Sequence, residues 1–141
     1  MPFEMQKIVI DTNVIVSALI GSSFPRKILF DFVFERELHL CLSNEVFEEY
    51  IEVLNREKFR KYPHFVTQAE IVLSRLLELS EKYVPTRRVS LISDESDNRI
   101  LELAIAAGAD FIITGNTQDF TFPDYEGIPI VTPYQFVMLF T

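Results

Sequence analysis

The chain has 141 residues, 48% of them hydrophobic and 24% charged, and its formal net charge at pH 7 is −8. These values describe one globular domain, and no apolar run approaches the roughly 20 residues that cross a bilayer, so a membrane protein is excluded. The acidic balance argues against a protein that coats nucleic acid by neutralising phosphates. A cluster of acids that held divalent cations would weaken that objection, because the cations invert the local field.

The amino terminus and the single cysteine indicate the compartment. Residues 1–6 have neither the basic start nor the apolar stretch of a signal peptide. We therefore expect a cytoplasmic protein in which one domain spans residues 1–141 and residues 1–6 form a flexible extension. Cys41 is alone, which excludes an internal disulfide and a cysteine-based zinc site, and inside an apparent strand it is most simply a small buried hydrophobe.

Apolar strands and amphipathic helices alternate along the chain. The strands are continuous apolar runs, which is typical of strands buried in a parallel sheet. In chain order we expect a strand at 8–10, helices at 14–19 and 25–35, a strand at 38–42, helices at 44–55 and 67–82, a helix after 93–97 that ends at 107, strands at 111–114 and 128–131, and a closing helix. This alternation predicts an α/β fold, a three-layer α/β/α sandwich with a central, mostly parallel sheet.

Several of these helices have recognisable starts or stops. Pro25 suits a first helical position, because its missing N–H would be unpaired there. Thr67–Glu70 has the spacing of a capping box, and Thr132–Gln135 combines a capping box with a first-turn proline. Gly108 supplies the expected stop for the helix before it.

Asp11 follows the first strand and is itself followed by Thr12 and Asn13. Open α/β sheets place their chemistry just beyond the carboxyl ends of such strands, which makes Asp11 a candidate metal ligand. A short polar side chain in this place also caps the next helix by accepting bonds from its free N–H groups. Taken alone, capping is the better interpretation, because the position of a residue in a fold does not by itself determine its chemical role.

The predicted helix at 44–55 carries four glutamates, which a helical wheel can rank. Glu45 and Glu52 point away from the apolar arc, Glu48 lies about 60° outside one edge of it, and Glu49 lies about 40° outside the other edge. Glu49 is therefore the acid nearest to the core boundary. A solvated acidic face explains Glu45 and Glu52 well and Glu49 least well.

Asp97 falls in the middle of the apolar arc formed by Ile100, Leu101, Ala104 and Ile105. Acids at a helix start are ordinarily explained by the helix macrodipole. A carboxylate that is aimed at the core needs a partner, however, because burying an unpaired charge is costly. A bound cation would be a suitable partner.

Two further segments carry polar or charged side chains. Gly115–Asp119 follows the strand at 111–114 and is the counterpart of the loop after the first strand. Residues 56–62 are the densest basic and aromatic patch, which suits an RNA-contacting edge, since cations hold phosphates while rings stack on bases. An ordinary solvated turn or an oligomer contact explains this patch equally well. Its cations are Arg56, Lys58, Arg60 and Lys61.

The order of these signals resembles the PIN domain, a family of divalent-metal-dependent ribonucleases that includes many toxins of prokaryotic toxin–antitoxin modules. The resemblance covers nearly the whole chain. The family pattern is an aspartate after the first strand, commonly followed by Thr-Asn, then a glutamate on an early helix, an aspartate that opens a later helix, and an acidic loop after the next strand. The matching segments are Val9–Val14, Ser43–Tyr50, Ser96–Arg99 and Thr114–Phe120.

The resemblance implies an endoribonuclease that cleaves single-stranded RNA with Mg²⁺ or Mn²⁺ and that is the toxin of a toxin–antitoxin module. Carboxylate-held cations suit this reaction, because phosphodiester cleavage needs an activated water and charge relief on the leaving oxygen. The implied catalytic and metal-binding carboxylates are Asp11, Glu49, Asp97 and Asp119, with Asn116 as a further metal ligand. Three residues would hydrogen-bond to these ligands: Thr12, Asn13 and Thr114.

The resemblance also implies partners. RNA would be the substrate, and an antitoxin would block the acidic pocket, most simply with a basic segment. Such domains commonly form homodimers, so we expect a homo-oligomer, although no stretch of the chain identifies the interface.

One departure from the family pattern leaves a rival function open. The family often has an aspartate directly after Thr-Gly, where this chain has Asn116. An amide oxygen can coordinate a hard cation but adds no charge and cannot act as a base, so one firmly held ion is expected, with a second arriving with substrate. The rival is a PIN-like domain that has lost activity and serves as a binding module.

Two other enzyme classes also place an aspartate after their first strand, and both fit less well. A haloacid-dehalogenase-like phosphatase needs a second aspartate where this chain has Asn13. A phosphoacceptor receiver domain needs a lysine after a late strand, and none lies near Val131.

Overall fold

Six strands form one sheet in the order β3-β2-β1-β4-β6-β5, in a computed structural model that describes residues 5–116 and 119–139. Among these residues every strand pairing is parallel except that of β5 with β6. The strands are β1 (Lys7–Ile10), β2 (His39–Leu42), β3 (Glu81–Lys82), β4 (Phe111–Ile113), β5 (Asp124–Tyr125) and β6 (Ile128–Val131).

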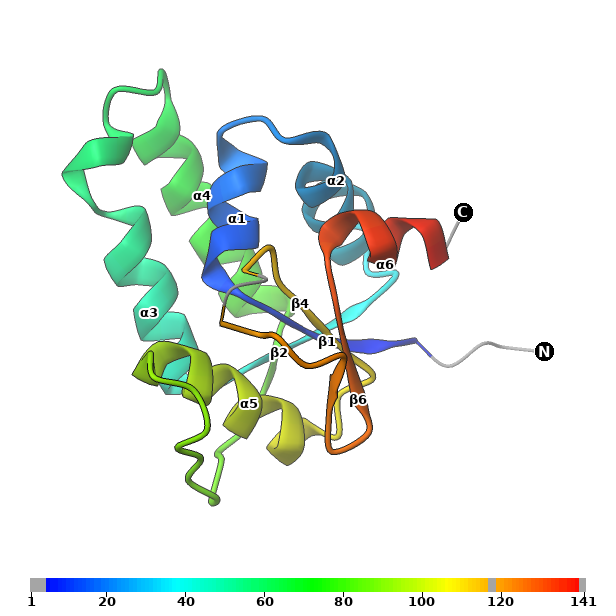
Figure 1. The fold of residues 1–141 in the computed structure, drawn as a ribbon. Helices are drawn as coiled ribbons and strands as arrows, with labels where there is room; N and C mark the ends of the chain where they lie inside the picture. Colours follow the sequence, from blue (N-terminus) through cyan, green and yellow to red (C-terminus); the bar gives the residue numbers. More distant parts are fainter. Residues whose placement is uncertain (1–4, 117–118, 140–141) are drawn as a thin grey trace.

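Helices cover both faces of this sheet, as the alternating pattern predicted, with α1 and α2 on one face and α5 on the other (Figure 1). The helices are α1 (Thr12–Leu19), α2 (Ser23–Arg26) with the π-helical continuation η1 (Lys27–Val33), α3 (Asn44–Leu54), the 3-10 turn η2 (Glu57–Phe59), α4 (Phe65–Leu79), α5 (Glu95–Ala107) and α6 (Pro133–Leu139). Within the described part of the chain, none of them is long and apolar enough to span a membrane.

Strand β1 is the centre of the core, because Ile8, Val9 and Ile10 are all 0% exposed. β1 pairs with β2 on one side and β4 on the other, and a chain buried on both faces requires the continuous apolar run that the sequence has. Immediately after β1, the backbone N–H of Asp11 donates to the carbonyl of Ile113 at the end of β4 (2.9 Å). The carboxyl ends of these two strands are thereby locked together.

Helices α1, α2 and α4 each begin two residues before the position predicted from the sequence. Pro25 is the third residue of α2, where no intrahelical donor is needed, since the first bond runs from Arg26 N–H to the Ser22 carbonyl (3.0 Å). The capping box predicted at Thr67–Glu70 is wrong: α4 begins two residues earlier, after His64 in a left-handed conformation (φ 62°). The same short-range spacing arises by chance inside a helix, so it does not fix a boundary.

The end of α4 also differs, because the helix stops at Leu79 rather than near Lys82. Ser80 is extended, and the Tyr83 N–H donates to the Leu42 carbonyl (2.8 Å), which draws the chain onto the edge of the sheet as β3. β3 and β5 have two residues each, which is too short to give a periodic pattern.

Two other helix signals are confirmed. Gly108 ends α5 with φ +61°, a conformation that a side chain would strain. At the start of α6, Thr132 and Gln135 exchange hydrogen bonds of 2.9 and 3.1 Å, which is the predicted capping box.

Candidate functional site

Asp11 lies at the carboxyl end of β1, 6% exposed, with its carboxylate held by three donors. The Thr12 N–H donates to Oδ1 (2.8 Å), while the Asn13 amide (2.9 Å) and the Thr114 hydroxyl (2.7 Å) donate to Oδ2. Burial raises the pKa of Asp11, and these three bonds oppose that rise. Asp11 therefore caps α1 and also faces the pocket described below, so the two interpretations of this residue are compatible.

Tyr50 stabilises the end of β1 next to Asp11. It lies on α3, its side chain is 0% exposed, and its hydroxyl donates to the carbonyl of Ile10, the residue directly before Asp11. In the sequence Tyr50 is only one member of an apolar arc, and no sequence pattern indicates that its hydroxyl bonds to a residue of β1. Tyr50 thus ties α3 to the end of β1 at the point where Asp11 is presented.

We expect Tyr50→Phe to lower the free energy of unfolding by about 1 kcal/mol, because it removes a buried hydrogen bond and little volume. Urea denaturation of the metal-free protein measures this change. Tyr62→Phe is the matched control, since the Tyr62 hydroxyl has no hydrogen-bond partner among the described residues. Equal stability of the two variants would show that the Tyr50 bond contributes nothing.

Glu49 reaches the same end of β1 from α3. It is half-buried, whereas Glu48 and Glu52 are exposed, as the helical wheel predicted. The prediction for Glu45 is wrong, because Glu45 is half-buried too and pairs with Arg88 (3.0 Å). Its Oε2 accepts a hydrogen bond from the Thr12 hydroxyl (2.9 Å). Burial is the main cause that raises the pKa of Glu49, and the Thr12 bond opposes it. Thr12 thus positions Glu49 beside Asp11.

Asp97 lies in the first turn of α5 and is 4% exposed. Its Oδ2 has no hydrogen-bond partner among the described residues, which is rare for a buried carboxylate oxygen. One oxygen each from Asp94, Asp97 and Asp119 lie within 4.8 Å of one another. Three acids thus converge at the start of α5.

Asp94 was absent from the candidates drawn from the sequence. It is the N-cap of α5, and its Oδ1 accepts from the Ser96 N–H (3.0 Å), so its position has an ordinary structural explanation. The signal that could have found it is its spacing of three residues from Asp97, which places both side chains on one side of a helix start.

The pKa values of two of these carboxyls are shifted. That of Asp97 is raised to about 8, first by burial and then by its hydrogen bond to the Asp119 carboxylate and by the charges of Asp11 and Asp94. The same bond and one from Asn116 lower the pKa of Asp119. The two shifts run in opposite directions, as expected when two carboxyl groups lie too close for both to ionise easily.

Two hydrogen bonds join the Asn116 side chain to Asp119. Its Nδ2 donates to Asp119 Oδ2 (2.9 Å), and its Oδ1 accepts from the Asp119 N–H (3.2 Å). Its own N–H donates to the Thr114 hydroxyl (3.0 Å). Thr117 and Gln118 of the predicted polar loop lie outside the described residues. In this arrangement the Asn116 side chain holds the carboxylate of Asp119.

A pocket of about 370 Å³ brings most of these side chains together. Its wall includes six of the predicted residues, together with Asp94 and two of the four cations: Asp11, Thr12, Asn13, Glu49, Asp97, Asn116, Arg56 and Lys58. Thr114 and Asp119 join this set through their bonds to Asp11 and Asn116. The remaining predicted cations, Arg60 and Lys61, do not line the pocket, because the chain turns away after η2.

The residues present fit a hard divalent cation. The donors are carboxylate oxygens, which Mg²⁺ and Mn²⁺ prefer, and the described residues of this pocket offer no sulfur or imidazole ligand. An Asp97 oxygen without a hydrogen-bond partner among the described residues, together with the raised pKa of Asp97, is expected where carboxylates gather closely, and a bound cation would balance their charge.

Comparisons with known proteins agree with this fold. The family model described as PIN domain matches residues 7–118. An uncharacterized protein of Methanocaldococcus jannaschii is 33% identical over 111 residues, which are 78% of this chain and 70% of that protein. The crystal structure of VapBC2 from Rickettsia felis, bound to a DNA fragment from their promoter, matches the fold with a TM-score of 0.56 at 15% identity, covering 90% of this chain and 98% of that chain.

Proposed function

Because the chain belongs to the PIN domain family, we propose that it is a divalent-metal-dependent endoribonuclease that cleaves single-stranded RNA, and that it is the toxin of a toxin–antitoxin module. The observation that carries the proposal is the cluster of the Asp94, Asp97 and Asp119 carboxylates, in which Asp97 is buried and has one oxygen without a hydrogen-bond partner among the described residues. Burying such a group is costly unless a ligand balances it, and selection for a function is a sufficient reason to retain it.

Each side chain has a role in this proposal. Asp11, Asp97 and Asp119 would hold a Mg²⁺ or Mn²⁺ ion, with Asp94 beside them. The bound ion would supply charge relief to the reacting phosphodiester. Glu49 is suited to take a proton from the attacking water, because its raised pKa brings it closer to neutral pH.

The remaining polar residues position these groups or meet the substrate. Thr12 orients Glu49, while Asn13 and Thr114 fix Asp11. Asn116 holds Asp119 and would not need to bind the ion itself. Arg56 and Lys58, at the rim of the pocket, are placed to attract the phosphates of an RNA strand toward an otherwise acidic protein.

The toxin assignment rests on the fold shared with the VapBC2 complex and adds a partner. An antitoxin that inhibits this chain would cover the acidic pocket, and a basic segment is the simplest complement to its carboxylates. A homodimer, which such domains commonly form, is part of the same proposal.

The experiment that tests the proposal combines metal binding with RNA cleavage. We expect saturating Mn²⁺ to raise the midpoint of thermal unfolding by about 5–10 °C. A ligand at 100 times its Kd adds about 2.7 kcal/mol to the free energy of unfolding, which gives a shift of this order in a protein of this size. We also expect cleavage of end-labelled single-stranded RNA in Mn²⁺ that EDTA abolishes.

A matched pair on α3 sharpens this experiment. We expect Glu49→Gln to reduce cleavage about 100-fold, since the amide still accepts from Thr12 but cannot take a proton. Glu48→Gln changes an exposed acid one position away and is the control. Cleavage that survives EDTA, or equal cleavage by the two variants, would contradict the proposal.

Asn116 favours a second candidate, a PIN-like binding module without activity. No carboxylate follows Thr114-Gly115, and both polar atoms of the Asn116 amide bond to Asp119. The two candidates differ in metal binding, because a binding module need not gain stability from Mn²⁺. Absence of any Mn²⁺-dependent thermal shift, together with absence of cleavage, would favour the module.

A further inference from the structure

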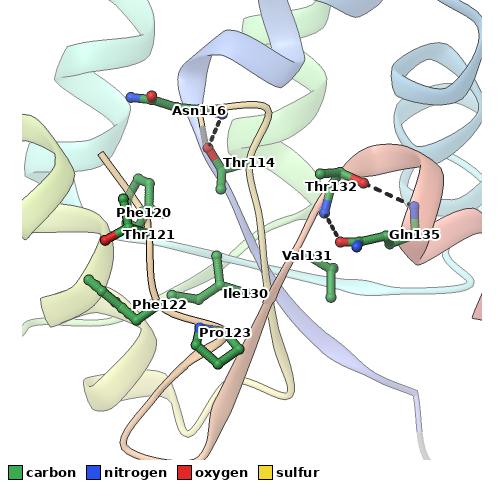
Figure 2. Close-up of a pocket in the computed structure, with 10 residues that line it drawn as sticks. All are labelled: Thr114, Asn116, Phe120, Thr121, Phe122, Pro123, Ile130, Val131, Thr132 and Gln135. Carbon is green, nitrogen blue, oxygen red and sulfur yellow. Dashed lines mark hydrogen bonds between the residues drawn. The ribbon is translucent and has the colours of Figure 1, made fainter. Parts of the chain in front are cut away.

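A second pocket, of about 520 Å³, adjoins the carboxylate site (Figure 2). None of the ten residues that line it is charged, although the chain carries a net charge of −8. Its wall consists of aromatic and aliphatic side chains together with short polar ones: Thr114, Asn116, Phe120, Thr121, Phe122, Pro123, Ile130, Val131, Thr132 and Gln135. We call it the neutral pocket.

The neutral pocket and the carboxylate pocket share a wall. Asn116 lines both of them. Thr114 lines the neutral pocket, while its hydroxyl donates to Asp11 in the other (2.7 Å). A ligand that extends beyond the carboxylates on this side therefore enters the neutral pocket directly.

The two sides of the neutral pocket differ in chemistry. Phe122, which is half-buried, and Pro123 contribute an apolar side, and Figure 2 shows them across from the capping box of α6. In that box, Gln135 Oε1 accepts from the Thr132 N–H (2.9 Å), and Thr132 Oγ1 accepts from the Gln135 N–H (3.1 Å). The Gln135 amide group and the Thr132 hydroxyl proton remain as donors without a partner among the described residues.

We infer that the neutral pocket binds a nucleobase of the RNA strand whose phosphodiester lies at the carboxylate site, and that it gives the cleavage its base preference. The identity of the strand rests on the function proposed above. Proteins recognise unpaired bases by stacking aromatic side chains on the ring and by hydrogen-bonding to its polar edge. Here Phe122 would contact the ring, and the Gln135 amide and the Thr132 hydroxyl would donate to acceptor atoms of the base. An uncharged pocket suits a base, because the base itself carries no charge at neutral pH.

The first test uses uncharged nucleosides and metal-free protein, so that it does not depend on cleavage. We expect millimolar adenosine, guanosine, cytidine or uridine to shift the NMR signals of Phe122 and the side-chain amide of Gln135, with at least one nucleoside preferred. Phe122→Ala should weaken this binding about 10-fold, the scale of one base–aromatic stack. Phe30→Ala, a half-buried phenylalanine outside both pockets, is the control.

The second test uses cleavage in Mn²⁺. Gln135→Glu keeps the oxygen that accepts from the Thr132 N–H and replaces the free amide donor with a carboxylate. We expect it to change the ratio of kcat/KM between RNAs that differ in one base by about 10-fold, chiefly through KM, while the helix it caps stays folded. Phe122→Ala should flatten the same ratio.

The outcomes separate this inference from the proposed function. Nucleoside shifts in a protein that cleaves no RNA would support the pocket and contradict the nuclease. Cleavage with no nucleoside shifts, and with the same base ratio in wild type and Gln135→Glu, would overturn the inference alone. Shifts at Phe122 that depend on protein concentration and not on nucleoside would assign the pocket to a second copy of the chain and would also overturn it.

Discussion

Replacing Asp97 by asparagine is expected to abolish metal binding and RNA cleavage and yet to make the metal-free protein more stable. The buried Asp97 carboxyl has an oxygen without a hydrogen-bond partner among the described residues, and burial and Asp119 raise its pKa to about 8, which favours proton uptake on folding. Asparagine avoids that proton uptake, and its amide can donate to Asp119 as the protonated carboxyl does. We expect a gain on the order of 2 kcal/mol at pH 7.

The pH dependence has a definite sign. A carboxyl with a pKa raised above its unfolded value stabilises the fold only while it is protonated, so its contribution is lost as pH rises from about 4 through about 8. The pKa values of Asp11 and Glu49 are also raised and act in the same direction, whereas that of Asp119 is lowered and acts in the opposite direction. The metal-free wild type should therefore lose stability across this range, and Asp97→Asn should lose less.

Urea unfolding in EDTA at pH 5, 6.5 and 8 measures these differences, and Mn²⁺ titration at the same pH values measures the loss of binding. Mn²⁺ competes with the proton for the carboxylates, so wild-type affinity should rise with pH. Asp31→Asn, an exposed acid on η1, is the control and should change neither slope. A lower stability of Asp97→Asn at all three pH values would mean that this carboxyl contributes native interactions that the structure does not contain.

The same residue shows what a sequence can reveal about a site. Asp97 was found because it interrupts an apolar arc, and its burial confirms that reasoning. Asp94 was missed because a helix cap accounts for it fully. Local rules therefore detect a clustered carboxylate when it violates them and overlook one that satisfies them.

Most of the other features that the sequence did not predict depend on contacts between residues that are far apart in the chain. The buried strands β1, β2 and β4 are visible as apolar runs, whereas β3 has only two residues and is defined by its pairing with the edge of β2. The basic patch at 56–62 is one feature in sequence, but of its four cations only Arg56 and Lys58 line the carboxylate pocket, and Arg56 also pairs with Glu52. Which side of a short turn faces a pocket depends on tertiary packing, and no local pattern encodes it.

Replacing Asp11 by asparagine is expected to abolish cleavage as Asp97→Asn does, but with the opposite effect on stability. The Asp11 carboxylate accepts three hydrogen bonds, from Thr12, Asn13 and Thr114. In asparagine an NH₂ group replaces one of the two carboxylate oxygens, so a donor would face the donors that Asp11 now accepts from. Such a mismatch between buried groups costs about 1–3 kcal/mol. We expect a cleavage loss of about 100-fold or more and a fall in the unfolding midpoint of about 2–10 °C.

A double-mutant cycle with Thr114→Val identifies the cause of that fall. Thr114→Val removes the hydroxyl that donates to Asp11, so the double variant should be more stable than the sum of the two single changes predicts, because both remove the same bond. Additive losses would contradict the assigned hydrogen bond. Two variants that both lose cleavage, one more and one less stable than wild type, cannot owe their inactivity to unfolding, so together they isolate the role of the carboxylates in the reaction.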